Sequence, residues 1–158
     1  MEFVWLYQIQ FQILAYVGLA MALGAVIGFE REIEDKPAGL RTHMLVAGAA
    51  ALFVALGDVV VRRFGVGLGN DLVQSDPVRI IQAVVTGVSF LGAGTILRHS
   101  AEHQVEGLTT AASILFAAAA GVCVALSQLV LAVGVTVLVL FTLRGVGSVQ
   151  RSLEQRRS

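Results

Sequence analysis

A dense group of charges lies between two apolar blocks of this chain. The stretch 28–46 reads GFEREIEDKPAGLRTHMLV and holds seven charged residues from Glu30 to Arg41. Each flanking block is long enough to cross a bilayer, so a plain hairpin linker would have served there. Glu30 and Arg41 border these blocks with opposite signs, and Arg98 borders a third block. We therefore predict that Glu30, Arg41 and Arg98 form one charge cluster at a membrane face.

A second set of ionisable groups lies at the other ends of these blocks. Asp58 lies in LFVALGDVVV, near the end of the second block, and Asp76 and Arg79 lie in SDPVR, at the start of the third. A carboxylate within the membrane normally faces a cavity or a partner, and Arg79 could then be the counter-ion of Asp58. At the water interface Asp58 would be an ordinary solvated group. The sequence leaves both readings open.

Residues for catalysis or metal binding do not form a recognisable pattern. His43, His99 and His103 match no metal-ligand spacing, and GAGTIL lacks the Lys-Ser/Thr pair of a phosphate-binding loop. Cys123 is the only cysteine, which excludes a disulfide within the chain. No nucleophile stands beside a base in the sequence. We predict a protein that is not an enzyme and has no cofactor, and the sequence identifies no ligands for Mg²⁺.

Composition indicates an integral membrane protein. Of 158 residues, 56% are hydrophobic and 14% are charged, and the mean hydropathy is +0.81. Soluble domains average about 45–50% apolar and about 25% charged residues. Eleven Lys and Arg balance eleven Asp and Glu without a basic stripe, which argues against nucleic acid as a partner. The bilayer is therefore the first predicted partner.

Five apolar segments are long enough to span the hydrocarbon core as helices. Ser127 and Gln128 are the polar break between the last two, so we predict a tight turn there. The expected fold is an all-α membrane protein with a transmembrane domain over 1–145 and a short basic tail over 146–158. The predicted spans are 11–29, 43–61, 78–97, 108–125 and 127–143.

The distribution of Lys and Arg predicts the orientation. With the N-terminus outside, eight of these residues lie on the cytoplasmic side and three lie outside, as the positive-inside rule requires. The charged stretch 28–46 is then cytoplasmic, together with the ends of the third and fourth spans. The resulting candidate functional cluster contains Glu30, Arg31, Glu32, Arg41, Thr42, Gly92, Gly94, Thr95, Arg98, Gly107, Thr109 and Thr110.

Small residues recur at spacings that allow close helix packing. Gly24 and Gly28 form a G-x-x-x-G pattern with Ala20 on the same face, and Ala117 and Gly121 repeat the spacing. Such faces let helices cross closely, either within one chain or between two copies. We favour a homodimer as the prediction.

Four ordered motifs resemble the N-terminal transmembrane domain of the MgtC/SapB family. The resemblance covers roughly residues 10–145. Two residues differ from the usual pattern of the family. Ser89 stands where a glycine is usual before FLGAG, and Leu115 stands near the tryptophan that often follows TTAAS. The ACT-like C-terminal domain of many members is missing. The motifs are GFERE (28–32), KPAGLRTHMLVAGAAALF (36–53), DPVRIIQAVVTGVSFLGAGTILR (76–98) and GLTTAASI (107–114).

The resemblance implies a five-span protein of the bacterial inner membrane that is linked to magnesium limitation and, in pathogens, to virulence. It also implies a regulator of other membrane proteins, such as the proton-driven ATP synthase. The alternative is a channel or transporter for magnesium or another cation, with Asp58, Asp76 or the acidic residues of the cytoplasmic side along the path. An ion path normally needs several carboxylates or carbonyls within the bilayer, and only Asp58 is a candidate. The sequence therefore favours regulation.

Overall fold

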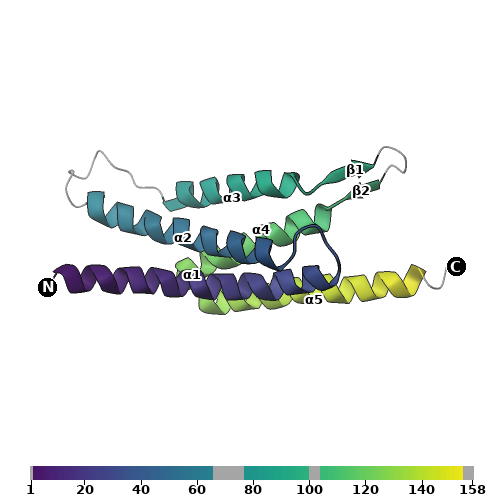
Figure 1. Cartoon of the computed structure of the whole chain (residues 1–158), viewed down its shortest axis with the longest axis horizontal. Helices are drawn as coiled ribbons and strands as arrows, with labels where there is room; N and C mark the ends of the chain where they lie inside the picture. Colours follow the sequence, from purple (N-terminus) through teal and green to yellow (C-terminus); the bar gives the residue numbers. More distant parts are fainter. Residues whose placement is uncertain (1, 66–76, 100–103, 155–158) are drawn as a thin grey trace.

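The computed structural model describes residues 2–65, 77–99 and 104–154, and the side chains of 7–61, 78–96 and 106–145. This part of the chain forms five helices and one β-hairpin (Figure 1). The antiparallel pair β1–β2 places Arg98 opposite Val105. The elements are α1 (Glu2–Ile33), α2 (Leu40–Gly65), α3 (Pro77–Ala93), β1 (Leu97–His99), β2 (Gln104–Glu106), α4 (Leu108–Ala125) and α5 (Leu129–Glu154).

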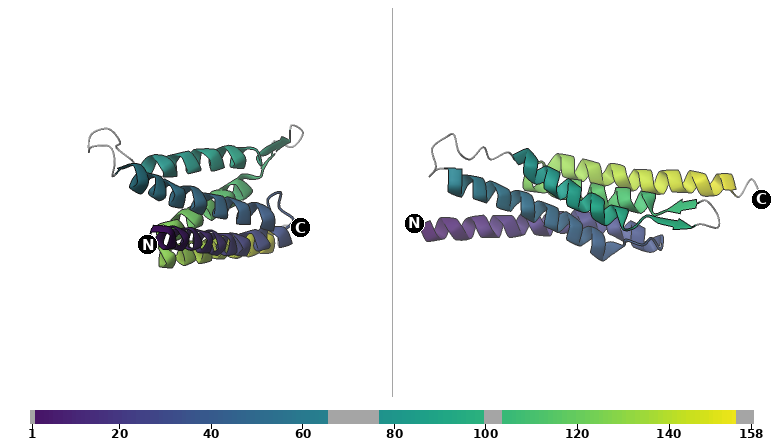
Figure 2. Two further views of the ribbon diagram at one scale, coloured as in Figure 1. Left: turned by 60° about the vertical axis from the view of Figure 1, so that its left-hand side comes forward. Right: turned by 90° about the horizontal axis from the view of Figure 1, so that it is seen from above.

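Three helices form the centre of the molecule. α1, α2 and α4 pack against one another, α3 lies against α2 and α4, and α5 lies against α4 and α1 (Figures 1 and 2). One end of the bundle carries the α1–α2 connection, the β-hairpin and the start of α4, and we call it the hairpin end. α5 ends at this end of the bundle, and α1 begins at the opposite one (Figure 1).

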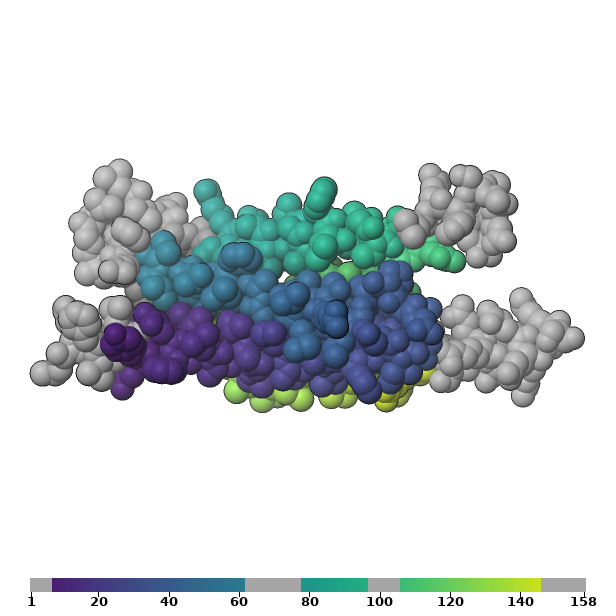
Figure 3. Space-filling view, viewed as in Figure 1, coloured from purple at the N-terminus to yellow at the C-terminus, as the bar shows by residue number. Residues whose placement is uncertain are grey.

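The distribution of side chains is that of a protein surrounded by lipid. Ala20, Ala47 and Ala117 are completely buried between the central helices. Large apolar side chains lie outside instead, with Phe90 84% exposed and Val130 90% exposed. Figure 3 views the face on which α1, α2 and α3 are in front. Such an apolar exterior is stable against hydrocarbon tails, which are as apolar as the side chains themselves.

The predicted helices all occur, although their lengths differ from the predicted spans. Among the described residues, Tyr7–Ile33, Leu40–Val61 and Leu108–Ala125 are long and apolar enough to cross a membrane, judged by length and composition. Val78–Ala93 and Leu129–Gly145 are shorter apolar helices. The five-span topology with the N-terminus outside stays a prediction.

The all-α fold class holds, with the short β-hairpin as an addition that the sequence did not predict. The third predicted span, 78–97, ends as a helix at Ala93. Gly94 has a low helix propensity, and the hydroxyl of Thr95 donates to the carbonyl of Gly92 at 2.8 Å, which satisfies a group at the helix end. The chain can then leave the helix and form β1. At the other boundary, α5 continues to Glu154, past the predicted domain limit at 145.

The predicted turn at Ser127–Gln128 is confirmed. Ser127 is left-handed, with φ 58°, and the amide of Gln128 donates to the carbonyl of Cys123 at 2.8 Å. This pattern is a Schellman motif, which satisfies the last carbonyls of α4 and reverses the chain. The hydroxyls of Ser127 and Tyr16 lie 2.9 Å apart, which fastens the turn to α1.

Glycines allow the central helices to approach backbone to backbone. A methyl group on Gly24 would lie 2.4 Å from the carbonyl oxygen of His43, and one on Gly28 would lie 2.8 Å from the Cα of Leu40. The G-x-x-x-G face of α1 therefore packs on α2 of the same chain. This contact occupies the face that motivated the homodimer prediction, so the homodimer loses that support.

The second small-residue face also packs within the chain, and it provides a test of the packing. A methyl group on Gly121 would lie 2.1 Å from the carbonyl oxygen of Ala47, whereas Gly134 has no atom within 4 Å of the same position. Gly121→Ala should lower the free energy of unfolding by about 1–3 kcal/mol, because a backbone carbonyl must move. Unfolding in mixed detergent micelles, followed by circular dichroism, measures this change.

Gly134→Ala is the matched control. It should leave stability unchanged or raise it by about 0.5–1 kcal/mol, because alanine is the better helix former. Equal effects of the two substitutions would contradict the close α2–α4 contact.

Candidate functional site

A buried ion pair lies at the hairpin end of α1. Glu30 and Arg31 are only 3% and 4% exposed. Their side chains form two parallel hydrogen bonds, from Nε to Oε2 at 2.5 Å and from Nη2 to Oε1 at 2.6 Å. A buried charge is costly unless it is paired, and this two-bond geometry is the strongest pairing that these groups form. The two opposite charges therefore cancel, and the pair adds no net charge to this end of the bundle.

The predicted cluster of Glu30, Arg41 and Arg98 is not formed between the two members whose side chains are described. Arg41 is exposed, and within the described side chains no ion pair joins it to Glu30. α2 turns His43 and Ala47 inward, so Arg41, two residues before His43, points outward on the same helix. The side chain of Arg98 lies outside the described residues.

Glu32 caps the start of α2. The backbone amide of Leu40 donates to its Oε2 at 2.7 Å. The first amides of a helix have no partner within the helix, and they attract negative charge. A methyl group on Gly39 would lie 1.9 Å from the same Oε2. Any larger residue at position 39 would therefore block the approach of the carboxylate to the helix end. Part of the charge in this stretch thus builds the α1–α2 connection.

His43 joins α2 to α4 through buried hydrogen bonds. Its ring is fully buried, with Nδ1 2.8 Å from the carbonyl oxygen of Gly39 and Nε2 2.9 Å from Oγ of Ser113. Oγ of Ser113 also lies 2.8 Å from the carbonyl oxygen of Thr110, and both residues are buried. Our sequence reasoning missed this pair, although His43 lies in the second motif and Ser113 in the fourth.

The distance between His43 and Ser113 is that of a base and the nucleophile it activates. Acyl transfer also needs amide donors aimed at a developing oxyanion. Ser113 lies inside α4, where the neighbouring amides donate to carbonyls of the helix itself. The described geometry of His43 and Ser113 is that of a polar contact between α2 and α4.

Residues of the third and fourth motifs meet at the start of α4. Gly107 has φ 88°, and a methyl group there would lie 2.0 Å from the carbonyl oxygen of Thr95. Gly92 is buried, and a methyl group on it would lie 3.4 Å from Cβ of Ala111. Sequence reasoning placed these motifs at the same end, and the structure brings their backbones into contact. Around them, Thr110 is buried, Thr42 is half-buried, and Gly94 and Thr109 are exposed.

The ionisable groups predicted for the opposite side do not form a buried site. Asp58, in α2, and Arg79, in the first turn of α3, are exposed. Asp76 lies outside the described residues, as do the side chains of His99 and His103. Within the described ranges, no group of three or more His, Cys, Asp or Glu residues is placed to hold a metal ion.

The apolar exterior, the small-residue core and the paired polar groups define a multi-helix integral membrane protein. Residues 17–152 match the model of the MgtC family. The chain therefore belongs to the MgtC family, as its motifs indicate.

Named relatives come from several bacteria. The chain is 46% identical to the putative magnesium transporter YhiD of Escherichia coli K12, over 66% of its own length and 46% of the relative. It is 39% identical to the protein MgtC of Salmonella typhimurium LT2, over 77% and 46% of the two lengths. It is 39% identical to the protein SrpB of Synechococcus elongatus, over 89% and 78%. The chain thus spans about half the length of YhiD and MgtC, and no solved structure matches it.

Breaking the buried ion pair should destabilise the protein strongly. Glu30→Ala or Arg31→Ala should lower the free energy of unfolding by about 3–5 kcal/mol, because the remaining charge is buried without its partner. Arg41→Ala is the control, and as an exposed site it should change stability by no more than about 0.5 kcal/mol. Unfolding in detergent micelles measures all three. A loss at Arg41 as large as at Arg31 would show that Glu30 pairs with Arg41 instead.

Removing the helix cap should act locally. Glu32→Ala should lower the free energy of unfolding by about 0.5–2 kcal/mol, because the first amides of α2 lose an acceptor. Amide hydrogen exchange should accelerate at Leu40, while exchange in the middle of α4 stays at its original rate. Unchanged protection at Leu40 would mean that Glu32 does not cap α2.

Proposed function

We propose that this protein is a non-catalytic regulator in magnesium homeostasis that acts by contact with another membrane protein. Membership of the MgtC family and the name of the relative YhiD support the link to magnesium. The finer proposal, regulation by contact, follows from how the chain uses its interior and its exterior. The family resemblance suggests the proton-driven ATP synthase as the partner to test first.

The closed centre of the bundle carries this proposal. Methyl groups on Gly24, Gly28 and Gly121 would each lie within 3 Å of backbone atoms of α2. Mg²⁺ dehydrates reluctantly and usually keeps several waters. A contact too close for one methyl group has no room for such an ion between α1, α2 and α4. The interior is built for close packing, which favours a protein that acts through its surface.

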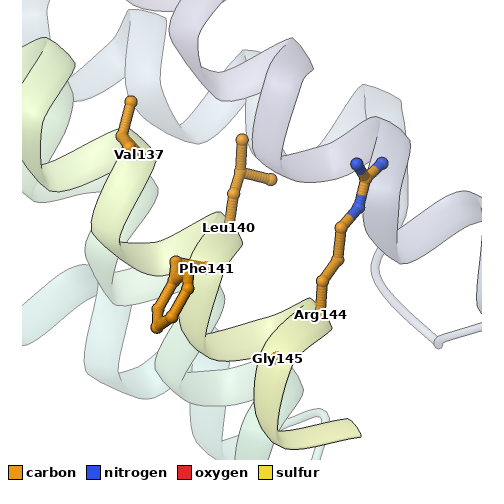
Figure 4. Close-up of a pocket in the computed structure, with 5 residues that line it drawn as sticks. All are labelled: Val137, Leu140, Phe141, Arg144 and Gly145. Carbon is orange, nitrogen blue, oxygen red and sulfur yellow. The ribbon is translucent and has the colours of Figure 1, made fainter. Parts of the chain in front are cut away.

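The outer helices supply such a surface. A shallow groove of about 450 Å³ on α5 is lined by Val137, Leu140, Phe141, Arg144 and Gly145. Val137, Leu140 and Arg144 project to one side of the helix, and Phe141 projects to another (Figure 4). This largely apolar groove suits contact with the apolar face of a membrane helix of a partner.

A transporter is the second candidate, and the name of YhiD is the observation that favours it. A cation path would need carboxylates within the membrane. Asp58, the carboxylate proposed for such a path, is exposed on α2 rather than enclosed by the bundle. A path that uses Asp58 would therefore run along the outside of the bundle.

Flux and cell physiology separate these two functions. Purified protein in sealed vesicles should pass no more Mg²⁺ than empty vesicles do, as measured with a dye that reports internal magnesium. Deleting the gene should instead change the ATP level or the membrane potential of cells starved of magnesium. Saturable Mg²⁺ flux that is lost in Asp58→Asn would establish the transporter and reject the regulator.

Surface variants test whether contact is the mechanism. Phe141→Ala should weaken the cellular effect, because it removes an exposed aromatic group from the α5 groove. Phe90→Ala removes a similarly exposed phenylalanine from α3, 84% exposed against 76% for Phe141, and should leave the effect unchanged. Glu30→Ala cannot serve this purpose, because it breaks the buried ion pair. Full activity of Phe141→Ala, at the same amount of protein in the membrane, would exclude the groove as the contact.

A further inference from the structure

The outer face of α3 carries polar side chains where a membrane helix normally presents apolar ones. α3 lies at the edge of the bundle, alongside α2 and α4, which are long and apolar enough to cross a membrane (Figures 1 and 2). Val84 and Gly92 form its buried side. Gln82, Thr86 and Ser89 are exposed on the opposite side, and we call these three residues the α3 polar stripe.

The α3 polar stripe has the spacing of a contact between two helices. Its residues are four and three positions apart, and the exposed Ala93 follows four positions further on. Alternating intervals of three and four residues keep side chains in one line along a helix that pairs with another. Small and hydroxyl-bearing side chains in such a line let two membrane helices approach closely.

Two members of the stripe have polar groups that the chain itself leaves unpaired. The hydroxyl of Thr86 donates to the backbone carbonyl of Gln82 at 2.8 Å. Among the described residues, neither the side-chain amide of Gln82 nor the hydroxyl of Ser89 forms a hydrogen bond. α3 has 17 residues, which is about 26 Å of helix against roughly 30 Å of hydrocarbon. Both groups lie past its first turn, in a layer where an unpaired amide is costly.

The other outer helix pairs its polar groups within the chain. On α5, the hydroxyls of Thr136 and Thr142 each donate, at 2.9 Å, to the carbonyl four residues earlier. Its large exposed side chains are apolar, as at Val130 and Val133. Lipid therefore suits the outer face of α5, whereas the outer face of α3 needs polar partners from outside the chain.

We propose that the α3 polar stripe binds the same stripe of a second copy of this chain. All copies insert into the bilayer in one orientation, so a twofold axis along the membrane normal brings the two Gln82 side chains together at one depth. An amide both donates and accepts, as does a hydroxyl, so Gln82 and Ser89 can each pair with their own copies. This self-complementary chemistry favours a second copy over an unrelated helix.

Charge does not oppose this pairing within the membrane. The side chains that flank the stripe, Val85 and Phe90, are uncharged and exposed. Arg79 lies one turn before Gln82, in the first turn of α3. Two copies of Arg79 would therefore meet at the membrane surface, where water and salt screen their repulsion.

Disulfide cross-linking in membranes tests the geometry. A Cys123→Ala background removes the only cysteine of the chain. In it, Ser89→Cys should form a covalent dimer on mild oxidation, because the two residues face each other across the axis. Val133→Cys, which is 50% exposed on α5, is the control and should stay monomeric. A Ser89→Cys chain that stays monomeric, or that couples to a different protein, would overturn the proposal. Equal dimer formation by the two variants would also overturn it.

Gln82→Leu tests the contribution of the amide. It should raise the dissociation constant of the dimer in lipid vesicles about tenfold, because an apolar side chain suits lipid and pairs less well. Energy transfer between labelled copies, measured as lipid is added, gives this constant. Circular dichroism checks that the helices are retained, and the cross-link, which keeps Gln82, stands as the test if this variant does not fold.

Gln10→Leu is the matched control. Gln10 is also exposed, but it lies 23 residues before the end of α1 at Ile33, which is about 35 Å and exceeds the hydrocarbon thickness. Its substitution should leave the dissociation constant unchanged. Equal constants for Gln82→Leu and the unsubstituted chain would overturn the proposal. These measurements involve no magnesium and no other protein, so their outcome is independent of the proposed function.

Discussion

The close approach of α2 to α1 and α4 is the constraint on which the rest of the structure depends. Gly24 and Gly28 bring α1 onto the start of α2, and Gly121 brings α4 onto its middle. In lipid, helices gain little from hiding apolar side chains, so this backbone-level contact supplies much of the attraction between them. It also leaves no room for a hydrated ion where these glycines meet α2.

The same contact buries the polar groups at the hairpin end. When α1 and α4 close on α2, they enclose Glu30, Arg31, His43 and Ser113. An enclosed polar group without a partner is expensive in a medium of low polarity. Among the described residues, no buried side-chain nitrogen or oxygen lacks a hydrogen bond. The polar groups are therefore part of the packing, and the contact surface that we propose lies on the outer helices.

This difference separates the closed centre of the bundle from its outer helices. α1, α2 and α4 form a closed core in which His43 joins α2 to Ser113 of α4, and Ser113 also lines the cavity between α4 and α5. α5 in turn carries the exposed groove proposed for a partner.

The sequence by itself determined the features that depend on local composition. Apolar runs located the helices, the polar break at Ser127 located the turn, and small-residue spacing indicated close crossings. These signals are local, because a helix or a turn is set largely by its own residues. The β-hairpin at Leu97–His99 was missed, since three-residue strands leave almost no periodic pattern.

Only the tertiary structure decided which polar groups meet. Glu30 was expected to reach Arg41 and binds its neighbour Arg31, because the rotation of α2 turns Arg41 outward. His43 and Ser113 are 70 residues apart, and each looked like an ordinary helix residue alone. Such pairs depend on the rotation of each helix about its axis and on the register between helices. Both are set by packing across the whole bundle, which no single segment encodes.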